Sequence, residues 1–303
     1  MPKKMKKALI IGAGALGSAF LSSTKDEFDE ITIFDGDVIS KENLKNQPFY
    51  RDADFNKIIS KANFAAEKMN SINPKIKYYS YNKYFTKENI EFVKDYDIVL
   101  DFTDNIKSRL IINKAVVEFG KPTVFASINE KELFLFFYKD TKACFNCLIR
   151  NANGRIREGC ESLVLPPSEK TIDFMHDKIT DFIIGKINGG ELQVFSLYNK
   201  KNINIKIKKD ENCEECSLHS FKIASNSVVQ LCASGLKFSL GREIDFSLLQ
   251  EEFKDGRIID EYFIYRNREK SVIISSKGDF LFTGYQIQEA KHLISILFDK
   301  YSK

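Results

Sequence analysis

Residues 7–17 read KALIIGAGALG, from Lys7 to Gly17. The apolar residues after Lys7 predict a strand, and Gly12, Gly14 and Gly17 follow with the spacing G-x-G-x-x-G as a helix opens at Ala15. Glycines at this spacing permit a tight turn and let backbone N–H groups approach a phosphate at the positive end of the helix. The stretch therefore predicts a nucleotide-binding loop, with mere close packing of strand on helix as the alternative.

Short apolar runs alternate with helix-period segments through the first half of the chain. Strands are expected at 7–11, 31–34, 76–81, 98–102 and 123–126, and helices at 57–71, 87–93 and 106–119. This alternation favours parallel strands joined by right-handed crossovers. The predicted fold is α/β, a Rossmann-like doubly wound sheet that binds ligands at the carboxyl ends of its strands.

The second half has a different pattern. We expect a strand at 133–138, a helix at 169–188 stopped by Gly189, and a strand pair at 192–198 and 203–208. The tail predicts a helix at 246–253, strands at 258–265, 272–275 and 280–282, and a last helix at 286–301. The expected organisation is one domain over 1–216 and a small α+β appendage over 217–303.

Composition excludes several classes of function. The 303 residues carry 46 Lys+Arg against 42 Asp+Glu, and this net charge of +4 is scattered, so no nucleic-acid partner is expected. No apolar run approaches the roughly 18 residues of a membrane span. The basic start before Ala8 imitates a signal peptide, but the same residues serve better as a first strand. Cysteine usage suits a reducing compartment, and the cytoplasm is the expected location.

Four of the six cysteines form two C-x-x-C pairs, Cys144/Cys147 and Cys213/Cys216. Each pair can make a chelating turn, and together they supply the four thiolates of a complete tetrahedral shell. The spacing predicts a closed, structural Zn²⁺ site in the later half of the first domain, against the alternative of four ordinary cysteines. Cys232 lies in an apolar run and is expected in a core.

Asp35 ends the second expected strand, 18 residues after Gly17. A carboxylate at this position commonly holds ribose hydroxyls, which by itself favours a nicotinamide dehydrogenase. The residues that follow argue against that reading. Residues 35–47 read DGDVISKENLKNQ and resemble the D-x-D…S-x-x-N-L-x-R-Q signature of the ThiF/MoeB adenylyltransferases, bacterial relatives of ubiquitin-activating enzymes.

Further matches to this family follow in order along the chain. Lys61 resembles its phosphate-contacting lysine, and 101–113, with Asp101, Asp104, Asn105, Arg109 and Asn113, resembles its D-x-T-D-N-x-x-x-R-x-x-x-N element. The two cysteine pairs fall where the family places its zinc ligands. Cys160 falls where the family commonly has a reactive cysteine, with an incidental loop cysteine as the alternative.

The resemblance implies an ATP-dependent adenylyltransferase, expected to be a homodimer. Its substrate would be the C-terminal carboxylate of a small ubiquitin-like or sulfur-carrier protein ending in Gly-Gly. Asp104, assisted by Asp37, would hold Mg²⁺, while Lys61 and Asn43 would contact the phosphates. The alternatives without a role in catalysis are that Lys61 is a solvated helix lysine and that Asp104 is a helix N-cap. The expected nucleotide residues are Gly12, Gly14, Ala15, Gly17, Asp35, Asp37, Asn43, Lys61, Asp104 and Asn105.

Two departures from the family pattern concern cations. Asn46 stands where the signature has an arginine, and the arm that delivers another arginine across the dimer has no counterpart before the first strand. Arg51 is the expected substitute if the chain turns at Pro48, in preference to Lys45. A partner subunit could also supply the charge. The open alternatives are adenylation of a peptide or small-molecule carboxylate, and a degenerate, non-catalytic nucleotide-binding subunit.

Overall fold

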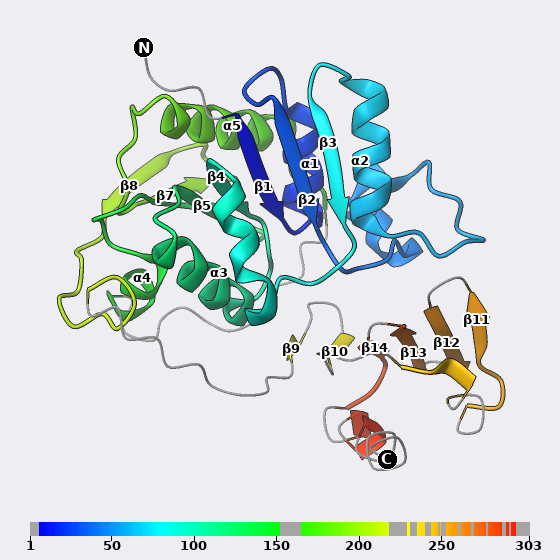
Figure 1. Cartoon of the computed structure of the whole chain (residues 1–303). Coiled ribbons are helices and arrows are strands. Elements are labelled where there is room, and N and C mark those ends of the chain that lie inside the picture. The colour runs from blue at the N-terminus through cyan, green and yellow to red at the C-terminus, as the bar shows by residue number, and fades with distance from the viewer. Residues whose placement is uncertain are drawn as a thin grey trace. The chain divides into compact units, whose positions relative to one another are not determined.

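The computed structural model describes two long stretches of the chain and several short ones. These are residues 6–151, 165–217, 229–230, 235–239, 244–247, 249, 253–259, 262–267, 270–276, 278–286, 289–290 and 292–294. The chain separates into two compact units, 1–222 and 223–303, which we describe in turn (Figure 1). That residues 1–216 form the adenylating domain remains a prediction.

The first unit is built on an eight-stranded sheet in the order β3-β2-β1-β4-β5-β6-β7-β8. Its first five strands run parallel, and β6, β7 and β8 extend it antiparallel beyond β5. The strands are β1 Lys7–Ile11, β2 Glu30–Phe34, β3 Lys77–Tyr81, β4 Ile98–Asp101, β5 Thr123–Ile128, β6 Glu132–Tyr138, β7 Glu191–Ser196 and β8 Asn202–Lys206. The predicted doubly wound α/β fold is confirmed.

Helices cover both faces of this sheet (Figure 1). They are α1 Ala15–Ser23, α2 Lys61–Ile72, α3 Ile106–Glu118, α4 Phe145–Asn151 and α5 Glu169–Ile183, with 3₁₀ turns η1 Lys41–Lys45, η2 Pro48–Tyr50 and η3 Lys87–Asp95. Successive side chains of β1 point to opposite faces of the sheet. Ala8 and Ile10 pack in the core that α1, α2 and α5 cover. Leu9 and Ile11 pack in the core that α3 and α4 cover.

The strand order creates a topological switch point near the centre of the sheet, and we use the word crevice for the region outside the carboxyl ends of the strands at this point. From β1 the chain adds β2 and β3 on one side, whereas β4 and β5 are added on the other side, so that β1 and β4 lie side by side. The loop after β1 meets the segment after β4 there, and Phe102 N–H donates to Ile11 C=O at 2.8 Å. In open α/β sheets this switch point is where ligands bind.

Several predicted element ends differ from the observed ones. The helix expected at 87–93 is the 3₁₀ turn η3, because the Asn89 side chain bonds to the backbone of Thr86 and Tyr84 and draws Asn89 out of helical geometry. The helix expected to reach residue 188 ends at Ile183, since Gly185 takes a left-handed φ of +81°. Helix α2 starts at Lys61 rather than 57, because Ser60 caps it.

The second unit contains an antiparallel sheet in the order β11-β12-β13-β14-β10-β9. The expected strand at 258–265 is two strands, and the sheet gains β9 and β10, which the sequence analysis did not predict. The helices predicted at 246–253 and 286–301 fall only partly within the described residues. The strands are β9 Val229–Gln230, β10 Gly235–Ser239, β11 Arg257–Ile259, β12 Tyr262–Asn267, β13 Lys270–Ser275 and β14 Asp279–Thr283.

Candidate functional site

The glycine loop after β1 combines tight packing with one open position. Gly12 has φ +95°, and a Cβ there would lie 2.9 Å from the Phe102 backbone. A Cβ on Gly17 would lie 2.1 Å from the Gly12 carbonyl oxygen, whereas a Cβ on Gly14 would meet nothing within 4 Å. Close packing therefore explains Gly12 and Gly17 but not Gly14, which faces open space where α1 begins.

The N-terminus of α1 suits an anion. Gly14 is the N-cap residue, no side chain of the described chain caps the helix, and its first turn, from Ala15, carries no acidic residue. The first backbone N–H groups of a helix have no partner within the helix, and they carry its positive partial charge. This end of α1 can therefore accept a phosphate group.

Asp35 is held rigidly beside this loop. Its Oδ2 accepts from the backbone N–H of Ala13 at 2.6 Å, and its Oδ1 accepts from that of Asp37 at 2.7 Å. Burial and the neighbouring Asp37 carboxylate raise the pKa of Asp35. Each carboxylate oxygen has a second lone pair, so the fixed side chain can still accept hydrogen bonds from ribose hydroxyls.

Lys61 is a buried cation facing carboxylates. It occupies the first position of α2, is only 5% exposed, and its Nζ lies 3.3 Å from Asp37 Oδ2. Burial alone lowers the pKa of Lys61, but the carboxylates of Asp37, Asp35 and Asp104 outweigh that effect and raise it. Lys61 is thus a charged group inside the crevice, and the alternative of a solvated helix lysine is wrong.

Tyr84 binds the second oxygen of the Asp37 carboxylate, and no pattern in the sequence predicted this contact. Its hydroxyl donates to Asp37 Oδ1 at 2.7 Å, and a Cβ on Gly36 would lie 2.7 Å from its ring. Asp37 is therefore fixed between Lys61 and Tyr84. No local signal marks Tyr84, because its contact joins residues that are 47 positions apart.

Asp104 and Asn105 follow β4 at the other side of the crevice. Asn105 caps α3, since its Oδ1 accepts from the Ser108 N–H at 2.8 Å, and its Nδ2 donates to Asp104 Oδ1 at 3.3 Å. The N-cap alternative considered for Asp104 thus falls on Asn105 instead. Asp104 is exposed, yet close enough to Lys61 for its charge to raise the lysine pKa. An exposed carboxylate at this point is suited to a hydrated Mg²⁺ carrying phosphates.

Arg109 stabilises the strand ends behind Asp104. Its Nη2 donates to the backbone oxygens of Thr103 at 2.5 Å and Ala126 at 2.6 Å, joining the carboxyl ends of β4 and β5. Its Nε lies 3.9 Å from Oδ2 of the buried Asp101. Both residues matched the family element, and the structure places them as supports of the crevice wall.

Two further predicted residues, Asn43 and Arg51, lie in the segment that follows Asp37. Asn43 lies in η1, where its Oδ1 accepts from the Ser40 hydroxyl at 3.1 Å. The expected turn at Pro48 is present as η2, but Arg51 after it is exposed and forms no ion pair or side-chain hydrogen bond with the described residues. Cys160 lies outside the described residues.

Tyr50, a second missed residue, ties this segment to the glycine loop. Its ring is fully buried, and its hydroxyl donates to the Ala13 carbonyl oxygen at 2.5 Å. Burial, with the carboxylates of Asp35 and Asp37, raises its pKa well above the usual range. The segment after Asp37 therefore packs directly against the candidate phosphate loop.

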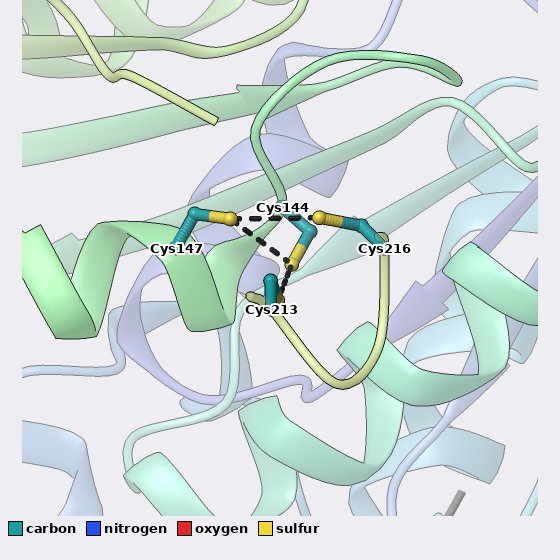
Figure 2. Close-up of side chains that lie close together, drawn as sticks. All are labelled: Cys144, Cys147, Cys213 and Cys216. Carbon is teal, nitrogen blue, oxygen red and sulfur yellow. Dashed lines mark hydrogen bonds between the residues drawn. The ribbon is translucent and has the colours of Figure 1, made fainter. Parts of the chain in front are cut away.

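The four cysteines of the two pairs converge in the same unit (Figure 2). Their sulfur atoms all lie within 4.8 Å of one another, and all four side chains are buried. Separations of 3.5 Å for Cys147–Cys216, 3.7 Å for Cys144–Cys213 and 4.0 Å for Cys144–Cys147 suit a tetrahedron, whose edges are roughly 3.8 Å for a Zn–S distance of about 2.3 Å. The donor set fits Zn²⁺.

Backbone and amide donors already surround the sulfurs. The Asp210 N–H lies 3.5 Å from Cys147 Sγ. Hydrogen bonds from Cys144 and from this N–H lower the pKa of Cys147 despite its burial, whereas the bond to Cys147 and burial raise the pKa of Cys144. Thiolates are the metal-binding form of cysteine, so a metal ion bound here would replace the protons that the four thiols hold.

A candidate phosphate loop at the switch point, a buried lysine among carboxylates and a four-thiol centre are together typical of a nucleotide-binding α/β protein with a candidate metal site. Comparison with known proteins refines this class. The sequence matches the ThiF family over residues 3–238, and the chain belongs to that family.

Two relatives cover most of the chain. The sulfur carrier protein ThiS adenylyltransferase of Bacillus subtilis is 26% identical over 269 residues, which are 84% of this chain and 80% of that protein. The adenylyltransferase and sulfurtransferase uba4 of Aspergillus fumigatus is 29% identical over 304 residues, covering 87% of this chain but only 60% of that protein. The enzyme class predicted from the sequence, an adenylyltransferase, is the class of these relatives.

Solved structures show the same fold. Escherichia coli MccB crystallised with ATP aligns with a TM-score of 0.55 at 18% identity, over 70% of this chain and 67% of that one. Within the described residues, no helix combines the length and the apolar character that a membrane crossing requires.

Proposed function

We propose that this protein is an ATP-dependent adenylyltransferase whose substrate is the C-terminal carboxylate of a small ubiquitin-like or sulfur-carrier protein ending in Gly-Gly. The observation that carries the proposal is the charged, buried Lys61 at the switch point, facing the carboxylates of Asp37, Asp35 and Asp104. A buried cation at this point can neutralise the negative charge that grows on the phosphates of ATP during adenylation. The names of the ThiF-family relatives support the same reaction.

In the proposed reaction a substrate carboxylate oxygen attacks the α-phosphorus of ATP. The new bond gives an acyl-adenylate, and the bond to the bridging oxygen breaks, so pyrophosphate leaves with that electron pair. The first turn of α1, open beside Gly14, would hold phosphate oxygens, and Asp35 would accept ribose hydroxyls. Lys61 would counter the negative charge that grows on the phosphates.

Asp37 has a second task in this proposal. Its Oδ2 lies 3.3 Å from the Lys61 ammonium, so Asp37 would keep this buried group charged and in place. Asp104, exposed at the crevice rim, would ligate Mg²⁺, which supplies Lewis-acid neutralisation of the phosphates when bound. Ala15 and Asn105 would contribute through the backbone at their two helix starts, and Asn43 through its amide.

The remaining assignments rest on the family. Cys160 would form a covalent link with the activated carrier or receive sulfur, Arg51 would supply the missing cation, and the active form would be a homodimer in the cytoplasm. The substrate class is supported by the ThiS adenylyltransferase, which aligns over most of both chains.

Two measurements test the proposal. Isothermal titration should show binding of ATP with Mg²⁺ and little binding of NAD, because Lys61 and Asp104 serve a triphosphate. Intact-mass analysis of a carrier ending in Gly-Gly should show addition of AMP after incubation with ATP, but not for the same carrier lacking its last glycine. Tighter binding of NAD than of ATP would contradict the proposal. Adenylation of a short peptide, without adenylation of any carrier, would contradict the carrier as substrate and favour a peptide carboxylate instead.

A second candidate is a degenerate subunit that binds nucleotide and pairs with an active partner. The observation that favours it is the small number of cationic side chains at the candidate site. Asn46 replaces an arginine of the family signature, and Arg51 is exposed. ATP binding without acyl-adenylate formation from an authentic carrier would favour this candidate.

A further inference from the structure

Helix α3 connects the nucleotide crevice with the cysteine centre. Its N-terminus carries Asp104 and Asn105 at the crevice, while Asn113, eight residues further along, is completely buried beside the cysteines. Eight residues of helix span about 12 Å. In the sequence, Asn113 is the last position of the D-x-T-D-N-x-x-x-R-x-x-x-N element. The proposed adenylation chemistry assigns it no role.

The Asn113 amide contacts both cysteine-bearing turns. Its Oδ1 accepts from the backbone N–H of Phe145 at 2.8 Å, directly after Cys144 in the first turn. Its Nδ2 donates to Glu215, which lies inside the second turn, and is 3.7 Å from Cys144 Sγ. One buried side chain on α3 therefore holds both halves of the metal centre.

A further contact joins the same elements. The Phe145 ring stacks on Phe125 of β5 at 4.7 Å, and the Arg109 guanidinium, one helical turn before Asn113, lies 5.8 Å from its centroid. Movement of the first cysteine turn would therefore disturb α3 at two positions on one face. Such partners behind the ligands orient them and tune the affinity of a metal centre.

We propose that Asn113 is an outer-shell residue of the zinc centre, through which metal binding holds helix α3, and with it Asp104 and Asn105, in place. The inference rests on zinc binding by the four cysteines and is independent of which carboxylate, if any, the protein adenylates. Asn113 is a positioning residue, since it acts through the two cysteine-bearing turns that it contacts.

The first test measures metal affinity by competition with a chromophoric zinc chelator. Asn113→Asp keeps the acceptor for Phe145 N–H but loses the donor to Glu215 and Cys144 and adds charge beside thiolates. Asn113→Leu removes both functions at similar volume. Each should bind zinc about 10- to 100-fold more weakly than wild type, whereas Asn63→Leu, at an exposed asparagine of α2, should not change the affinity. Wild-type affinity in both Asn113 variants would overturn the proposal.

A second pair of variants keeps the test decisive should Asn113 substitutions fail to fold. Glu215 and Glu214 are neighbours in the second turn, but only Glu215 accepts from Asn113, and Glu214 is exposed. Glu215→Leu should weaken zinc binding, and Glu214→Leu should leave it within about threefold of wild type. Equal affinities of the two variants would contradict the inference.

Amide hydrogen exchange measures directly whether metal binding at the cysteines stabilises helix α3. In wild type, chelation should increase amide exchange across residues 106–113, and zinc-loaded Asn113→Asp should exchange there as the chelated wild type does. Exchange in the 61–72 helix should change less. Protection of α3 that does not respond to metal removal would overturn the coupling, whether or not the protein adenylates a carrier.

Discussion

At the scale of single residues, the crevice depends on charges whose partners the structure fixes. Lys61 is buried and still charged because Asp37, Asp35 and Asp104 surround it. Its residue type and position were predictable from the family signature. The hydroxyls of Tyr50 and Tyr84 were not, because each acts on a residue 37 or 47 positions away and neither belongs to a local motif.

Tyr84→Phe tests the support of Asp37. The variant keeps the ring against Gly36 and loses the hydrogen bond to the Asp37 carboxylate. A hydrogen bond to a charged group contributes about 1.5–3 kcal/mol, so we expect denaturant unfolding to show a loss near about 1.5 kcal/mol at this half-buried site. Tyr79→Phe, at a half-exposed tyrosine, is the control, and equal stability of the two variants would refute the assigned contact.

At the scale of elements, local patterns predicted the strand, the glycine loop and both cysteine turns. Each depends on residues close together in sequence: an apolar run, a glycine spacing, a C-x-x-C pair. Element ends were predicted less well. Helix α5 ends at Ile183 rather than just before Gly189, because only the folded chain shows that Gly185 takes a left-handed conformation. The double contact of Asn113 was likewise invisible in the sequence, since its partners Phe145 and Glu215 lie 32 and 102 positions further along the chain.

The glycine loop offers a matched pair of variants. Gly17→Ala would place a methyl 2.1 Å from the Gly12 carbonyl, and such overpacking should cost about 1–3 kcal/mol or more of stability. Gly14→Ala meets open space, and its φ of −73° is ordinary although its ψ of −149° lies just outside the extended region, so it should cost less stability than Gly17→Ala. We expect its ATP affinity, by titration calorimetry, to fall at least about tenfold, because the methyl occupies the approach of the phosphate. Unchanged ATP affinity in folded Gly14→Ala would argue against the phosphate loop.

A pH-sensitive contact joins α5 to the loop between α1 and β2. His176 Nε2 lies 2.8 Å from Glu27 Oε1. Burial raises the pKa of Glu27, but the hydrogen bond from His176 and the other hydrogen bonds outweigh it and lower that pKa below 4.5. A lowered folded-state pKa gives stability that is present above about pH 4.5 and is lost as the pH falls through the folded value.

Glu27→Gln should therefore lower the free energy of unfolding at pH 7 and flatten its decline on acidification. Thermal or urea unfolding at several pH values between about 3 and 7 checks this. The exposed Glu118→Gln serves as the control. A Glu27→Gln profile that runs parallel to wild type would show that this carboxylate contributes no acid sensitivity.

At the scale of the whole molecule, the first unit joins two sites through one sheet and one helix. The order β3-β2-β1-β4-β5 creates the crevice, and the antiparallel extension through β8 leads the chain to the second cysteine pair. The doubly wound class was predictable from the alternation of elements. The extension of the second unit by β9 and β10 was not, because those short strands carry too weak a pattern.

Removal of zinc should destabilise the first unit as a whole. A structural metal contributes its binding free energy to folding, and this centre joins segments near residues 144 and 213 that are far apart in the chain. We expect chelation to lower the melting temperature measured by calorimetry, and re-addition of Zn²⁺ to restore it. A melting temperature that is insensitive to chelator, in protein shown to carry zinc, would contradict a structural role.

The central claim, carboxylate adenylation at the switch-point crevice, is tested most directly by ATP–pyrophosphate exchange with a carrier ending in Gly-Gly. Loss of an electrostatic donor at such a site costs about 2.7–4 kcal/mol, or roughly 10²–10³ in rate. We predict carrier-dependent exchange in wild type and a loss of that size in Lys61→Met, while Lys57→Met, at an exposed lysine before α2, retains it. Exchange that survives in Lys61→Met at the wild-type rate would contradict the account.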